Sequence, residues 1–149
     1  MLNNPFWRKK HVITQHFWEN PQMYAQFGWK WHNGIDFRCN LDHVFATHPW
    51  IVTAIDDKTW YGKHVKIKRI LHDWGYETIY GHFSEIYVKT GDFVTSKQVI
   101  GKSGNTGNST GQHLHFWIRF FDEKWNLKDK WNGFGGWVDP LPYFQEWKI

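Results

Sequence analysis

The sequence predicts an all-β protein, built mostly from an antiparallel sheet with long loops between some of its strands. Short runs rich in Val, Ile, Thr and aromatic residues recur between clusters of Gly, Asn and Asp, which is typical of strands separated by turns. Helical periodicity is scarce along the chain. Most connections are short, and short connections favour antiparallel over parallel pairing.

Six segments have the composition of strands. The segment 64–70, HVKIKRI, alternates most clearly between apolar and charged residues. Because side chains on a strand point alternately to two faces, Val65 and Ile67 should face the core while Lys66 and Lys68 meet solvent. The six expected strands are residues 11–15, 34–39, 50–55, 64–70, 77–83 and 113–120.

The segments between these strands carry turn and loop signals. One helical turn is expected in 20–26, NPQMYAQ, and polar glycine-rich loops are expected over 102–111 and 121–136. The chain shows no internal repeat and no linker to a second domain. We therefore expect a single domain over residues 1–149.

Length and composition limit the classes of protein to which this chain can belong. With 149 residues, 41% of them hydrophobic, the chain can bury its own core, but no apolar run approaches the ~20 residues that span a bilayer. The first 15 residues contain no long apolar stretch, so no signal peptide is visible. The formal charge of +4 suits an anionic partner such as nucleic acid or a bacterial wall polymer, and is also common in ordinary soluble proteins.

A pair of histidines marks the segment 111–118, GQHLHFWI. On an extended chain, residues two apart share a face, so His113 and His115 should project together. A buried strand gains nothing from two adjacent imidazoles, whereas a metal site does. The ten histidines of this small chain favour the metal interpretation.

A second candidate lies in WHNGIDF, where His32 and Asp36 are four residues apart. On an extended segment this even spacing places both side chains on one face, and Gly34 argues against the helical alternative. His32, Asp36 and one histidine of the later pair would form an open zinc site, although these ligand types do not exclude other divalent metals. No HExxH occurs, which excludes helix-borne zinc peptidases of that kind.

A third segment, IYGHFS, ends a probable strand with His82. Taken in order, HNGID, YGHFS and GNTGNSTGQHLHF resemble the motifs of the lysostaphin-type, or LytM-type, zinc metallopeptidases, and the resemblance covers roughly residues 12–143. It implies an antiparallel sheet with a groove that holds one Zn²⁺ ion. Carried over residue by residue, it implies His32, Asp36 and His115 as ligands and His82 and His113 as the two catalytic histidines.

Members of that family hydrolyse peptide bonds in the stem or cross-bridge of bacterial peptidoglycan. The resemblance therefore implies a zinc endopeptidase whose partner is a wall peptide and not nucleic acid.

Two alternatives stay open. One is a non-catalytic LytM-like domain that binds the wall or activates other hydrolases, and the other is a carbohydrate-binding module, suggested by the 20% aromatic content. A substrate outside the cytoplasmic membrane, with no visible export signal, suggests a phage-associated enzyme or an incomplete N-terminus. The sequence does not decide the peptide bond cleaved, the general base, the oligomeric state or the export route.

Other polar residues lack motif partners and are expected to be structural. Cys39, the single cysteine, lies three residues after Asp36 and should face away from the metal, into the core. The histidines expected to be bystanders are His11, His16, His43, His48, His64 and His72.

Many of the twelve tryptophans stand where this family leads us to expect glycine, which allows positive φ or close approach. Two interpretations compete: an unusually aromatic groove, or a TGA codon that some genetic codes assign to tryptophan and others to glycine. Trp117 shares a face with the paired histidines, so its indole should wall off a subsite or stack on substrate. The clearest positions are Trp31, Trp50, Trp60, Trp74 and Trp117, and the weaker ones are Trp18 and Trp125.

Overall fold

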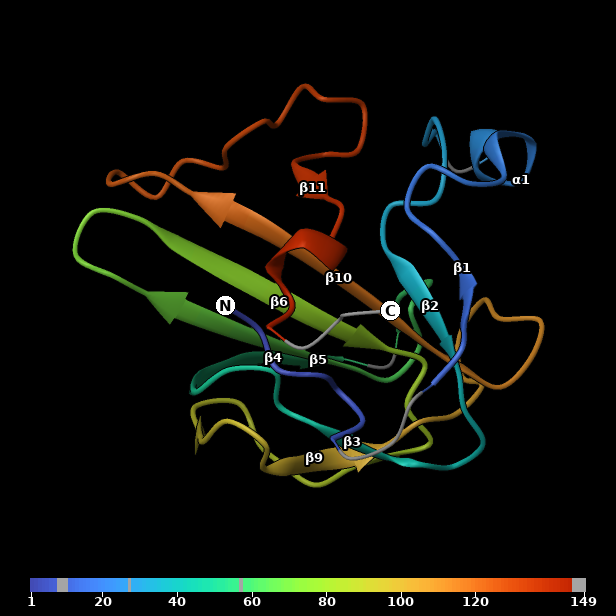
Figure 1. Ribbon diagram of the computed structural model, residues 1–149, viewed down its shortest axis with the longest axis horizontal. Helices are drawn as coiled ribbons and strands as arrows, with labels where there is room; N and C mark the ends of the chain where they lie inside the picture. The colour runs from blue at the N-terminus through green and yellow to red at the C-terminus, as the bar shows by residue number, and fades with distance from the viewer. Residues whose placement is uncertain (8–10, 27, 57, 146–149) are drawn as a thin grey trace.

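An antiparallel sheet runs through the centre of the protein, and a smaller sheet lies beside it (Figure 1). The computed structural model describes residues 1–7, 11–26, 28–56 and 58–145. Within them, the large sheet has the strand order β1-β2-β10-β6-β5-β4-β8, with β11 paired to β10, and the small sheet has the order β3-β9-β7. The elements are β1 (Ile13–Gln15), α1 (Pro21–Ala25), β2 (Ile35–Arg38), β3 (His43–Phe45), β4 (Trp50–Asp56), β5 (His64–Ile70), β6 (Gly75–Gly81), β7 (Glu85–Ile86), β8 (Phe93–Val94), β9 (Val99–Lys102), β10 (His113–Phe121), β11 (Trp137–Val138) and the 3-10 turn η1 (Leu141–Tyr143).

The all-β, antiparallel prediction is confirmed, and each of the six expected strands is present with bounds that differ by at most two residues. The strand expected over 77–83 is β6, which ends at Gly81, so His82 lies just beyond it. Five further strands of two to four residues were not predicted, because so short a run gives little periodic signal; β1 and β2 are as short but lie within longer segments of strand composition. The five unpredicted strands are β3, β7, β8, β9 and β11.

The core gathers apolar side chains from the central strands. On β10, Leu114 and Phe116 are fully buried. On β5 the expected alternation is seen, with Val65 and Ile67 buried and Lys66 and Lys68 partly exposed. Cys39 is also buried in this core, as predicted. Burial of these side chains is the main favourable contribution to folding.

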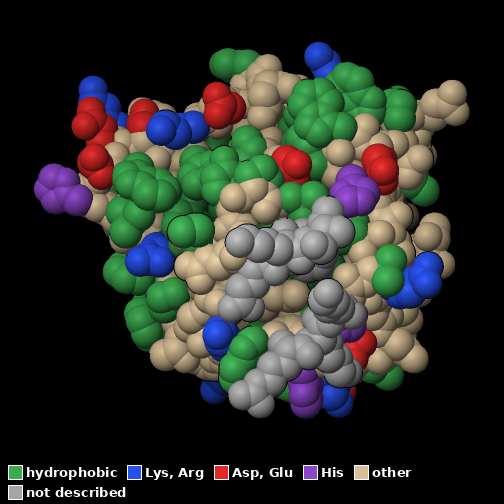
Figure 2. Space-filling view, in the orientation of Figure 1, with side chains coloured by type: hydrophobic (Ala, Val, Ile, Leu, Met, Phe, Trp, Pro, Cys, Tyr) green, Lys and Arg blue, Asp and Glu red, His purple; other side chains and the backbone are tan. Residues whose placement is uncertain are grey.

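The surroundings of the sheet are mostly loops. The short helix α1 lies close to β1 and β2, at one end of the large sheet (Figure 1). On the face drawn in Figure 2, charged side chains are interspersed among the hydrophobic ones. No helix in the described part of the chain has both the length and the apolar character needed to cross a bilayer.

Candidate metal centre

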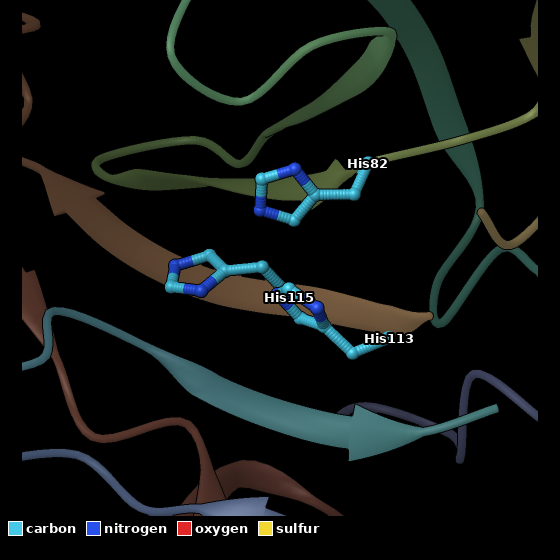
Figure 3. A group of neighbouring side chains, drawn as sticks. All are labelled: His82, His113 and His115. Carbon is cyan, nitrogen blue, oxygen red and sulfur yellow. The ribbon is translucent and has the colours of Figure 1, made fainter. Parts of the chain in front are cut away.

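The candidate centre forms where β10 lies between β2 and β6. In the antiparallel ladders, His115 is the partner of Asp36 on one side and of Gly81 on the other. Figure 3 shows His113 and His115 projecting from β10, and His82 just after the end of β6. The two-residue period of β10 thus delivers both histidines of the pair to one place, next to the aspartate that the sequence separates by 79 residues.

Three side-chain atoms converge in this place. Asp36 Oδ1 lies 2.7 Å from His115 Nδ1 and 3.3 Å from His32 Nε2, and the two imidazole nitrogens lie 3.0 Å apart. Ligands of a tetrahedral zinc ion stand about 3.3 Å from one another, given bonds of about 2.0–2.1 Å. Two imidazole nitrogens and one carboxylate oxygen at these distances therefore fit one zinc ion, with a fourth position left for water.

The ring of His32 is oriented by the backbone of a preceding turn. Its Nδ1–H donates to the carbonyl oxygen of His16 at 2.9 Å, which directs Nε2 toward the other two ligand atoms. Such a second hydrogen bond fixes the tautomer of a ligating imidazole. The sequence pattern did not reveal this acceptor, because every residue carries a carbonyl group.

Burial and mutual contact set the protonation of the group. Burial alone would raise the pKa of Asp36, but the charge interaction and hydrogen bond with His115, followed by His32, outweigh it and hold that pKa well below its usual range. Burial lowers the pKa of His115 to about 3, against the opposing influence of Asp36. An ionised carboxylate and neutral imidazoles are the forms that bind a metal ion.

His82 and His113 lie beside this group, with their ring centroids 4.6 Å apart. The Nδ1–H of His82 donates to the carbonyl of Thr106 at 2.7 Å, and that of His113 donates to the carbonyl of Gly111 at 2.8 Å, so both Nε2 atoms remain for substrate or water. Burial, and then the proximity of His113, lowers the pKa of His82 to about 4.

The backbone of His82 is unusual, with φ of 64°. Left-handed backbone costs a non-glycine residue about 1–3 kcal/mol and is concentrated at functional sites. His82, His113 and His115 also lie close enough together to hold an ion. We favour the group that contains Asp36, because its carboxylate offsets the charge of a divalent cation.

The group opens into a groove of about 660 Å³. Asp36, His82, His113 and His115 all line it, together with residues of α1 and of the loop around residues 108–110. Tyr61 was not identified from the sequence, yet it lines the groove and its ring stacks on His115, with centroids 6.1 Å apart and planes 25° apart.

Trp117 does not line this groove, and the expectation that it walls off a subsite or stacks on substrate was wrong. Its side chain shares the face of His115, as the two-residue period requires, but it is fully buried against His115, Tyr61 and Trp137. The indole therefore packs on His115 without reaching the groove.

The histidines expected to be bystanders take no part in either metal-binding group formed by the described residues. His16 contributes only its carbonyl oxygen. His48 is buried, and its ring bonds the carbonyl of Pro49 and the hydroxyl of Thr78.

Known proteins resemble this chain in sequence. The chain is 40% identical over 86 residues to the peptidoglycan DD-endopeptidase ShyA of Vibrio cholerae serotype O1, an alignment that covers 57% of this chain and 19% of that protein. It is 38% identical over 89 residues to lysostaphin of Staphylococcus simulans, covering 57% of this chain and 17% of that protein. The chain thus spans about a fifth of the length of these relatives.

Solved structures agree with the sequence comparison. The structure of lysostaphin from Staphylococcus simulans superposes with a TM-score of 0.67 at 26% identity, over 89% of this chain and 48% of that one. The catalytic domain of the prophage-encoded M23 protein EnpA from Enterococcus faecalis gives a TM-score of 0.69 at 27% identity, over 93% of this chain and 95% of that one. The profile of peptidase family M23 matches residues 30–127, and the chain therefore belongs to peptidase family M23.

Proposed function

We propose that this protein is a zinc-dependent endopeptidase that hydrolyses peptide bonds in the stem or cross-bridge peptides of bacterial peptidoglycan. The observation that carries the proposal is the convergence of His32, Asp36 and His115 within 2.7–3.3 Å, beside an open groove that Asp36 and His115 line. The names of the relatives, one a peptidoglycan DD-endopeptidase and the other the antimicrobial peptidase lysostaphin, support the substrate class.

His32, Asp36 and His115 would hold one Zn²⁺ ion through Nε2, Oδ1 and Nδ1. A zinc ion in such a site lowers the pKa of water toward about 7 and polarises a carbonyl group. The carbonyl of His16 keeps the ring of His32 in the ligating orientation.

His113 is the better placed of the two other histidines to take the proton of the attacking water. Its Nε2 lies 3.8 Å from Asp36 Oδ1, so it faces the space beside the ligand atoms. The bond from its Nδ1–H to Gly111 leaves Nε2 as the basic nitrogen. The same imidazole can afterwards return the proton to the leaving amine.

His82 and Tyr61 are suited to the opposite task, the stabilisation of negative charge on the scissile carbonyl oxygen. The ring of His82 lies next to that of His113, and both line the groove. Burial raises the pKa of Tyr61, so its phenol stays protonated and can donate a hydrogen bond at neutral pH. Donors placed in advance where charge develops are among the largest contributions to catalysis.

The wall would be the place of action, because its polymer carries the substrate. The formal charge of +4 favours weak attraction to anionic wall polymers. An open groove lets a peptide within a cross-linked network enter from the side, without a free end.

The test is digestion of purified peptidoglycan with and without a chelator, followed by mass analysis of the fragments. We expect new amino termini in the sample without chelator, none with chelator, and recovery on addition of zinc. Binding to peptidoglycan without any cleavage, in protein loaded with zinc, would refute the proposal and select the non-catalytic alternative.

A further inference from the structure

A tight turn over residues 16–19 holds the metal ligand His32. Three hydrogen bonds join the two: the Nδ1–H of His32 donates to the carbonyl of His16 at 2.9 Å, the backbone N–H of His32 donates to the carbonyl of Glu19 at 2.9 Å, and the N–H of Trp18 donates to the carbonyl of His32 at 3.1 Å. Both the ring and the backbone of His32 are thus positioned by this turn.

The turn depends on an unusual backbone conformation at residue 18. The N–H of Glu19 bonds back to the carbonyl of His16, so Phe17 and Trp18 are the central residues of a β-turn. Trp18 has φ of 77°. The corresponding position of a type II turn has φ of about +80° and takes glycine or asparagine, because a Cβ atom is crowded there.

We propose that residue 18 is a positioning residue for the metal centre, acting through the carbonyl of His16 on the ring of His32. Its side chain packs on the rings of Phe17, Trp31 and Phe134. The backbone conformation at residue 18, not the indole, is what the centre requires. This inference rests on the proposed zinc site.

Four variants of the full chain test it, with zinc affinity measured by competition against a chromophoric chelator. W18G, W18N and W18V all remove the indole, but only valine is strongly disfavoured at positive φ. We expect W18G and W18N to bind zinc at least as tightly as the parent protein, and W18V to bind it about tenfold or more weakly than W18G. W125V is the matched control, because Trp125 also has positive φ, 62°, and is not among the residues lining the groove.

Circular dichroism establishes that each variant is folded, and W18A replaces W18V if valine prevents folding. A zinc affinity in W18V or its replacement equal to that of W18G, or a drop from the parent to W125V as large as the drop from W18G to W18V, would overturn the positioning role while leaving the proposed function intact. Failure of the parent chain itself to bind zinc would overturn both.

A separate observation concerns tryptophans in left-handed backbone. Among the described residues, the non-glycine positions with positive φ include three tryptophans: Trp18 at 77°, Trp50 at 155° and Trp125 at 62°. Asparagine and aspartate tolerate such values because their short side chains bond locally, but tryptophan has no such compensation.

Trp125 lies in a hairpin loop in which glycine is the expected residue. The N–H of Trp125 donates to the carbonyl of Asp122 at 3.0 Å, and the N–H of Asp122 donates to the carbonyl of Asn126 at 3.0 Å. Three-residue hairpin loops of this kind end with a left-handed residue, usually glycine. Trp50, at the start of β4, has a φ that glycine adopts far more easily than other residues.

The backbone assigns glycine to positions 18, 50 and 125 in the protein as its own organism makes it. A TGA codon, which some genetic codes assign to glycine and others to tryptophan, accounts for all three positions together. Four further tryptophans that we expected at glycine-like positions do not have positive φ, so the backbone argument does not extend to them. These are Trp31, Trp60, Trp74 and Trp117.

Intact mass of the protein isolated from its own organism tests this assignment. We expect the mass to be lower than that of the printed sequence by at least three replacements of tryptophan by glycine. A mass that retains all twelve tryptophans, or TGG codons at the three positions, would overturn the assignment.

A stability comparison gives an independent readout on recombinant protein. Trp125 and Trp74 are 37% and 39% exposed, but only Trp125 has positive φ. We expect W125G to melt at a higher temperature than W74G, because glycine relieves strain only at position 125. An equal or lower melting temperature for W125G would count against strain at that position.

Discussion

Asp36 and His115 face each other across the ladder between β2 and β10, with Oδ1 and Nδ1 only 2.7 Å apart. Both side chains are buried. The imidazole of His115 lowers the free-energy cost of burying the ionised carboxylate of Asp36. A buried carboxylate without a full counter-charge is costly, and a divalent cation is the group that would complete this arrangement.

Replacing Asp36 by asparagine should remove zinc binding with little change in shape. Loss of a group that only hydrogen-bonds to a metal ligand typically lowers metal affinity by about 10–100-fold. Asparagine at position 36 removes the charge of a ligand itself, so we expect a larger fall in zinc affinity, and peptidoglycan cleavage should be lost in parallel. Isothermal titration with zinc measures this. D73N, at an exposed turn position, should bind zinc as the parent does. Tight zinc binding by D36N would exclude Asp36 as a ligand.

Replacing His113 by alanine should slow catalysis while leaving the metal in place. Loss of a general base typically costs 10²–10⁴-fold, and His113 is not one of the three proposed ligands. Cleavage rate and zinc content, measured on the same sample, separate the two effects. The exposed His72 provides the control variant, H72A, which should keep full activity. If H113A loses its zinc, the group of His82, His113 and His115 is the metal site instead.

Replacing Tyr61 by phenylalanine tests its proposed role as a hydrogen-bond donor. The ring stacking on His115 is preserved in Y61F, so only the hydroxyl is lost. We expect kcat to fall by about tenfold or more, with a smaller change in KM, because the donor acts mainly on charge that develops in the transition state. Steady-state kinetics on a synthetic cross-bridge peptide would show this. An unchanged kcat would exclude the role.

His48 should make the folded protein sensitive to mild acid. Burial lowers its pKa from 6.5 to about 4. As the pH falls from 6.5 toward 4, the unfolded chain takes up a proton that the folded chain does not, so the free energy of unfolding falls, by up to roughly 3 kcal/mol. The contribution of neutral His48 to the free energy of unfolding is therefore complete above pH 6.5 and is lost progressively as the pH falls from 6.5 to about 4.

Urea denaturation at pH 7 and pH 4.5, with chelator present, measures this contribution. We expect the difference in unfolding free energy between the two pH values to be smaller in H48Q than in the parent protein. Equal differences would show that His48 does not titrate across folding. H43Q, at an exposed histidine, serves as the control.

The sequence by itself determined the fold class and which residues of a strand share a face, and the resemblance of three of its motifs to those of a known family indicated the candidate ligands. The reason is that the two-residue period of a strand is a local property: it places His113 with His115, whatever the rest of the chain does. The same period correctly sorted the lysines of β5 from its buried aliphatic residues. These inferences needed no knowledge of which strands pair.

Only the tertiary structure decided the pairing of β2 with β10, and hence the distance between Asp36 and His115. The orienting carbonyls of His16, Thr106 and Gly111 were also out of reach, because a carbonyl group is common to all residues and only folding selects which ones meet a ring. Trp117 was placed on the correct face but not at the correct depth. Depth depends on which distant side chains cover a position, and that is set by long-range packing instead of local periodicity.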